Sequence, residues 1–112
     1  MFIQSLDSNK FSLEYGIKLR RLYPNEYIDD NPPFGSSWGI IKPNECTTPH
    51  SHHEAESFYI IEGKGIMQID EQLENVKAGD VIFIPAYSTH QLTNFQTDEN
   101  LQFISIWWEK GD

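Results

Sequence analysis

Two stretches of the chain decide its fold: PHSHHEAESFYIIEG at residues 49–63 and GDVIFIPAYSTHQLTN at residues 79–94. Together they contain all four histidines of the protein. Each stretch joins a run of β-branched and aromatic residues to turn residues such as glycine and proline. The sequence therefore predicts a strand in each stretch, with the histidines carried on or beside those strands.

The spacing within the first stretch predicts a cluster of ligating side chains. Alternate residues of an extended strand point to one face, so His50 and His52 project side by side. Glu56 has the same parity and shares that face with the apolar residues that follow it. This prediction requires an unbroken strand over residues 50–60, and a bend near His53 would violate it.

Imidazole nitrogens combined with one carboxylate form a ligand set for a divalent transition metal. Such a set suits zinc, iron, manganese, cobalt or nickel and fits calcium poorly. The His-x-His pair alone fits a solvated strand equally well. The wider pattern decides between these interpretations.

The first stretch resembles the first motif of the cupin superfamily. That motif has two histidines one residue apart, then a glutamate, and later a glycine. This chain has His50-x-His52, then three residues and Glu56, then six residues and Gly63.

The second stretch resembles the second cupin motif. It gives Gly79, five residues, Pro85, and then His90 and Asn94 at the expected spacings. The 15 residues between Gly63 and Gly79 match the short gap of compact bacterial members.

The resemblance implies an all-β fold, a single-domain cupin jelly-roll β-barrel over residues 1–112 with its motifs at 50–63 and 79–94. It also implies one divalent transition metal per chain, with zinc expected first and iron, manganese or nickel as alternatives. The implied metal ligands are His50, His52, Glu56 and His90.

Two turn positions depart from the cupin motifs. Asn44 and Tyr87 stand where the motifs have glycine. Asparagine tolerates the left-handed conformation whereas tyrosine does so poorly, so we expect a differently shaped turn before His90.

Two further residues of these stretches have expected roles of their own. We expect His53 to lie on the surface or to contact the ligands from outside the metal site. We expect Asn94 to form hydrogen bonds with backbone groups of a turn.

The rest of the chain reads as short strands separated by turns. Residues 24–37 are rich in proline, asparagine and aspartate, and residues 17–23 before them are either a strand or a brief helix. The turn signals farther along are EGKG, DEQLEN and KAGD. The expected strands after residue 35 are 36–42, 57–62, 65–70, 80–85, 90–95 and 101–108.

Composition limits the partners that we expect. The 112 residues include 17 acidic and 8 basic ones, for a net charge of −9, which repels nucleic acids and anionic membranes. A single cysteine, Cys46, allows no intrachain disulfide. The N-terminal MFIQSLDSNK lacks the pattern of a signal peptide, and no apolar run is long enough to span a bilayer, so we expect a cytoplasmic protein. Apolar residues on both parities of 57–61 and 103–108 predict a homodimer.

A finer resemblance concerns function. The first stretch, the turn IPAYSTH at 84–90 and the ending LQFISIWWE at 101–109 resemble the cupin module that is fused to a methionyl-tRNA-synthetase-like module in hydrazine synthetases. In that family the ligase part esterifies an N-hydroxylated amine with an amino acid, and the cupin rearranges the ester to form an N–N bond. The resemblance implies an enzyme that needs a separate ligase. A metal-dependent dioxygenase or isomerase acting on a small polar metabolite, and a non-catalytic sensing module, remain open alternatives.

Overall fold

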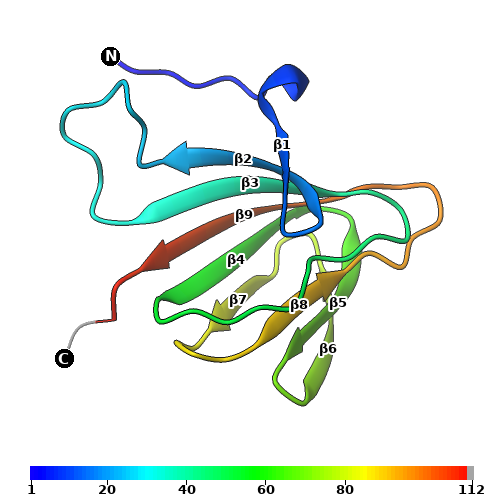
Figure 1. The fold of residues 1–112 in the computed structure, drawn as a ribbon. Helices are drawn as coiled ribbons and strands as arrows, with labels where there is room; N and C mark the ends of the chain where they lie inside the picture. The colour runs from blue at the N-terminus through cyan, green and yellow to red at the C-terminus, as the bar shows by residue number, and fades with distance from the viewer. Residues whose placement is uncertain (111–112) are drawn as a thin grey trace.

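Two antiparallel sheets form the framework of the protein (Figure 1), for which the computed structural model describes residues 1–110. Six strands form one sheet in the order β1-β2-β3-β9-β4-β7, and three form the other in the order β6-β5-β8. The last two residues of the expected 1–112 domain lie outside the described residues. The elements are η1 (Ser8–Lys10), β1 (Ser12–Glu14), β2 (Ile17–Tyr23), β3 (Gly35–Ile41), β4 (Ala55–Glu62), β5 (Lys64–Ile69), β6 (Gln72–Lys77), β7 (Val81–Ile84), β8 (His90–Thr93) and β9 (Leu101–Trp108).

The all-β prediction is confirmed, since the one helical element among residues 1–110 is the short 3₁₀ turn η1. None of the helical structure described there has the length and apolar character needed to cross a membrane. Each of the six strands expected after residue 35 is present, with ends that differ by a few residues from those expected. The stretch at residues 17–23 is a strand, β2, and not a helix.

One expected turn is shorter than its sequence indicates. The DEQLEN stretch predicts a turn over residues 70–75, but only Asp70 and Glu71 turn, and β6 begins at Gln72. Asp70 takes a left-handed φ of 51°, which aspartate tolerates, and this lets β5 and β6 pair directly. Because β6 is exposed at every position except Val76, its residues show no alternation of buried apolar and exposed polar positions that would reveal a strand.

The inner face of the six-stranded sheet supplies most of the core. On β9 the inward positions Leu101, Phe103 and Ser105 are buried, whereas the residues between them are only partly covered. Burial of each large apolar side chain contributes about 1.5–3 kcal/mol. The remaining core residues are Ile17, Leu19, Ile41, Phe58, Ile60, Met67, Val76, Ile84 and Leu92.

Two glycines on the inner face of β3 make room for aromatic side chains of β9. A Cβ atom at Gly35 would lie 2.1 Å from the Trp107 ring, and one at Gly39 would lie 2.5 Å from the Phe103 ring. Both rings therefore lie directly against the β3 backbone. This packing forms one wall of the cavity described below.

The two departures from the motif glycines keep the backbone shape that glycine would give. Asn44 has a φ of 63° and Tyr87 a φ of 68°, both in the left-handed region. The expectation of a differently shaped turn at Tyr87 is therefore wrong. The strain is accommodated because the Tyr87 side chain is 75% exposed, while its backbone N–H donates to the carbonyl of His52 at 2.8 Å.

Asn94 acts as expected on turn backbone groups. Its side chain is fully buried, and its amide donates to the carbonyls of Ile41 and Glu99 at 3.0 and 2.9 Å. Its Oδ1 accepts from the backbone N–H of Gln96 at 2.9 Å. Asn94 thus ties the segment before β9 to the end of β3.

Candidate metal centre

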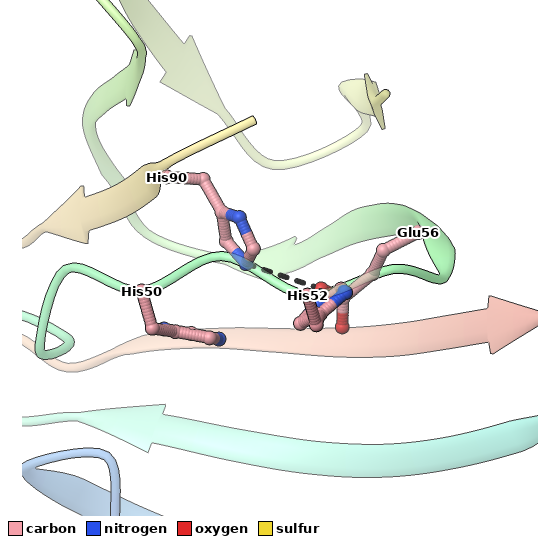
Figure 2. Close-up of side chains that lie close together, drawn as sticks. All are labelled: His50, His52, Glu56 and His90. Carbon is pink, nitrogen blue, oxygen red and sulfur yellow. Dashed lines mark hydrogen bonds and ion pairs between the residues drawn. The ribbon is translucent and has the colours of Figure 1, made fainter. Parts of the chain in front are cut away.

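The four predicted ligands meet between the two sheets. His50 and His52 precede β4, Glu56 lies on β4 in the six-stranded sheet, and His90 begins β8 in the three-stranded sheet. One ligating atom from each of the four lies within 4.8 Å of the others. Figure 2 shows His90 and Glu56 approaching from different strands, with the other two imidazoles beside them.

The route by which these side chains converge differs from the expected one. The chain bends at His53 and Glu54, and β4 begins only at Ala55, so the strand over residues 50–60 is broken. Backbone bonds outside β4 hold the first histidines instead. His50 and His90 exchange backbone N–H···O bonds of 3.3 and 3.0 Å. The carbonyl of His52 is held by the turn before β8.

The three imidazoles share one tautomer. Each Nδ1 lies against a backbone carbonyl: His50 against Thr48 at 2.8 Å, His52 against Glu54 at 3.0 Å and His90 against Ser88 at 3.3 Å. A carbonyl only accepts, so each Nδ1 must carry the donated hydrogen. In a neutral ring with its hydrogen on Nδ1, Nε2 carries a lone pair that can bind a metal. The hydrogen bond at Nδ1 also fixes the direction in which Nε2 points.

The buried ends of these side chains fit a cation. His90 Nε2 is buried and has no hydrogen-bond partner in the described part of the chain, although Glu56 Oε1 lies 3.2 Å away, within ion-pair distance. His52 Nε2 lies 3.0 Å from the same oxygen. A carboxylate oxygen offers no hydrogen, so lone pairs would face one another unless a proton or a metal ion lay between them. Three nitrogens and one carboxylate oxygen are donors that zinc and first-row transition metals accept.

His50 is held in the form that binds metal. Burial lowers the pKa of His50, and the positive charge of a protonated His90 would lower it further. The neutral ring is thereby favoured at physiological pH. The Tyr15 ring stacks on it with centroids 4.4 Å apart and an interplanar angle of 22°. Tyr15 is a contact that the sequence pattern did not reveal.

His53 lies on the surface, as expected. Its Nε2 is 2.8 Å from a carboxylate oxygen of Glu109, and this hydrogen bond raises the pKa of His53. With Glu54 these two residues form a second group of potential ligands, but the side chains of His53 and Glu109 are 56% and 76% exposed. Over residues 1–110, no buried nitrogen or oxygen of these three side chains lacks a hydrogen-bond partner. This group therefore has no counterpart of the unpaired His90 Nε2 in the first group.

A cavity of about 170 Å³ is lined by three of the candidate ligands, His50, His52 and Glu56. This is smaller than the roughly 300–1,000 Å³ of pockets for drug-sized ligands, so it suits a small metabolite. Apart from three of the candidate ligands, most of its lining was not identified from the sequence. The lining residues are Tyr15, Ile17, Leu19, Arg21, Ser37, Thr47, His50, His52, Glu54, Glu56, Phe58, Phe103, Ser105 and Trp107.

Solved structures with the same fold cover nearly the whole chain. A protein of Photorhabdus luminescens is 35% identical, with a TM-score of 0.88 over 98% of this chain and 89% of that one. A cupin 2 conserved barrel domain protein of Salinispora arenicola is 32% identical, with a TM-score of 0.86 over 97% and 89%. These likenesses confirm the jelly-roll architecture of the cupins.

Curated relatives match over shorter regions. An uncharacterized protein of Methanocaldococcus jannaschii is 34% identical over 74 residues, which are 65% of this chain and 58% of that protein. A 5-nitrosalicylic acid 1,2-dioxygenase of Bradyrhizobium is 31% identical over 65 residues, 58% of this chain and 31% of the enzyme. The chain thus spans less than two thirds of the length of either relative.

The family model for the cupin domain matches residues 37–107, a segment that contains all four candidate ligands. That segment begins within β3 and ends one residue before the end of β9, and so includes most of both sheets. The chain belongs to the cupin domain family.

Proposed function

We propose that this cupin is a metal-dependent enzyme acting on a small polar metabolite. The observation that carries the proposal is the orientation of three imidazoles, each held at Nδ1 by a backbone carbonyl with Nε2 directed to Glu56 and a cavity. His50, His52, Glu56 and His90 would hold the ion, zinc being the first choice and iron the second. Four protein ligands leave one or two coordination positions for a substrate or water.

The bound metal would supply Lewis-acid polarisation or, if it is iron, activation of oxygen. The residues of the chain would shape the cavity and orient the ligands. Phe58 and Phe103 line the cavity and exclude water from its apolar side. The backbone carbonyls behind the histidines fix the direction of the ligand atoms, so the site needs little rearrangement to bind the ion.

The specific reaction that we propose first is N–N bond formation in hydrazine synthesis. Its support is the resemblance of residues 49–63, 84–90 and 101–109 to the cupin module of hydrazine synthetases. A separate tRNA-synthetase-like ligase would supply the ester of an amino acid and an N-hydroxylated amine, and the cupin would rearrange it. We place this activity in the cytoplasm, where the free thiol of Cys46 suits a reducing environment.

A dioxygenase is the second candidate, favoured by the 31% identity to a 5-nitrosalicylic acid 1,2-dioxygenase. A small-molecule sensor that binds its ligand without turnover is the non-catalytic alternative. One set of assays separates the three.

Zinc-loaded protein mixed with a cognate ligase, ATP, an amino acid and an N-hydroxylated amine should form a hydrazine without consuming oxygen. The His50→Ala variant should stop at the ester, which mass spectrometry identifies. Oxygen uptake by iron-loaded protein with 5-nitrosalicylate would establish the dioxygenase instead. Metal-dependent binding of metabolites without any turnover would contradict both reactions and favour the sensor.

We also propose a homodimer formed through the outer face of the six-stranded sheet. Strand register places Tyr59 beside Val81 on one side and Ile104 on the other, and Ile104 beside Trp38. Phe83 extends this face next to Trp108, with ring centroids 6.4 Å apart. Tyr59, Val81 and Phe83 are 37%, 61% and 60% exposed. A second copy fits this face because its aromatic and aliphatic side chains carry no charge, so two chains of net charge −9 can meet there without opposing acidic groups.

Light scattering at micromolar concentration should give twice the chain mass. The variant Phe83→Glu should be monomeric, because two carboxylates would be buried at the contact. Leu73→Glu is the matched control, since Leu73 is 62% exposed but lies on β6 of the other sheet. A monomeric wild-type protein would contradict the proposal.

A further inference from the structure

A row of side chains crosses the inner face of the six-stranded sheet next to the candidate metal centre. Register pairs Phe58 of β4 with Ser105 of β9, Ser105 with Ser37 of β3, and Ser37 with Arg21 of β2. All four line the same cavity. Because β4 and β2 are three strand spacings apart, the row covers about 14 Å of backbone. It runs from Phe58, whose ring centroid lies 6.0 Å from that of His90, to Arg21.

The two serines leave one buried hydrogen-bond donor unused. Their hydroxyl oxygens are 2.6 Å apart, and each residue is only 2% exposed. Each hydroxyl has one hydrogen to donate, and the mutual bond uses one of the two. No other side-chain bond is made by these hydroxyls among residues 1–110. The second hydrogen is therefore available to an acceptor in the cavity, and leaving it without one costs free energy.

Arg21 places a positively charged group beside Ser37, at the side of the cavity formed by β2. It is the one lysine or arginine among the lining residues, and its guanidinium lies 5.9 Å from the centroid of the Trp107 ring. Glu14 accepts from Nε at 3.1 Å and from Nη2 at 2.9 Å. The bonds to Glu14 use Nε and Nη2, and the Tyr15 hydroxyl is a further neighbour of the guanidinium, so Glu14 positions Arg21 with Nη1 outside the ion pair.

We infer that Arg21 and the Ser37–Ser105 pair bind the carboxylate of the substrate, whose other end reaches the metal. The Nη1 side of the guanidinium and the hydroxyl donor match two carboxylate oxygens, and one guanidinium already paired with Glu14 has room for one further carboxylate. The body of the substrate would lie on Phe58 and Phe103, so the substrate class is a small monocarboxylate with an apolar body. The inference rests on the proposed function, because it names the substrate class of that same site.

The test measures binding of small carboxylates by calorimetry with zinc-loaded and metal-stripped protein. The probes are propionate, benzoate and salicylate, each compared with its neutral amide, and inorganic phosphate. At least one carboxylate should bind at least tenfold more tightly than its amide and than phosphate. The Arg21→Gln variant should lose that tenfold preference and keep the zinc content of the wild type.

Two further variants separate binding from structural support. Glu14→Gln removes the ion pair but leaves the guanidinium, so carboxylate binding should persist if Arg21 contacts the ligand. Ser37→Ala combined with Ser105→Ala should weaken binding several-fold. Equal binding to Arg21→Gln and wild-type protein, equal binding of carboxylates and amides, or no carboxylate binding would each overturn the inference. Zinc content in the same samples reports separately on the proposed function.

Discussion

Substituting His90→Ala should lower the zinc content of the protein from about one ion per chain to less than ~0.1. His90 is 1% exposed, and its Nε2 has no hydrogen-bond partner among residues 1–110. The substitution would remove one of the four ligands, the one whose side chain is most buried. His50→Ala should have a similar effect at a less buried position, where the risk of disturbing the fold is lower. Elemental analysis of the purified variants gives the result.

His53→Ala is the matched control for these variants. It removes a histidine one residue from His52, but one whose side chain is 56% exposed and bonded to Glu109. Its zinc content should equal that of the wild type. Circular dichroism shows whether each variant is folded. Full zinc content in folded His50→Ala and His90→Ala variants would contradict the assignment.

The second large effect concerns stability: Gly63→Ala should cost about 3–4 kcal/mol of unfolding free energy. Gly63 has a φ of 85°, and an added Cβ would lie 2.5 Å from the carbonyl oxygen of Asn100. That oxygen belongs to the backbone, so it cannot move aside as the end of a flexible side chain could. The substitution therefore combines left-handed strain with a clash. Urea denaturation measures the loss, which is a large part of the ~5–15 kcal/mol typical of a domain.

Gly79→Ala separates these two causes. Gly79 also has a positive φ, of 95°, but a Cβ there would meet nothing within 4 Å. It should cost only the conformational strain, about 1–2 kcal/mol. If both variants lose the same stability, the close approach at Gly63 does not matter and the explanation of that motif glycine is wrong.

The sequence predicted the parts of this protein that follow from spacing. All of the strands expected after residue 35 are present, and His50, His52, Glu56 and His90 meet as expected. Alternation along β4 correctly placed Glu56 on the inner face, because that strand is regular from Ala55 onward.

What the sequence missed depends on contacts between distant segments. The bend at His53 and Glu54 breaks the expected strand, and backbone bonds to residues near His90 restore the convergence. Tyr87 keeps a left-handed turn because the backbone bond to His52 fixes it. Parity alone does not reveal such bonds.

The cavity was missed for a related reason. Arg21, Ser37 and Trp107 come from three strands, and only the strand order brings them to one surface. The sequence GSSWGII at residues 35–41 did contain a signal. Its inward-facing glycines, Gly35 and Gly39, leave room for the aromatic side chains of a neighbouring strand. The pairing of β3 with β9 was needed to interpret it.

Anomalous X-ray diffraction from crystals of the zinc-loaded protein, measured at the zinc edge, tests the central claim most directly. The account predicts one strong peak per chain, about 2.0–2.2 Å from the Nε2 atoms of His50, His52 and His90 and from a carboxylate oxygen of Glu56. Absence of a peak there, or a peak only at the exposed group of His53, Glu54 and Glu109, would contradict it.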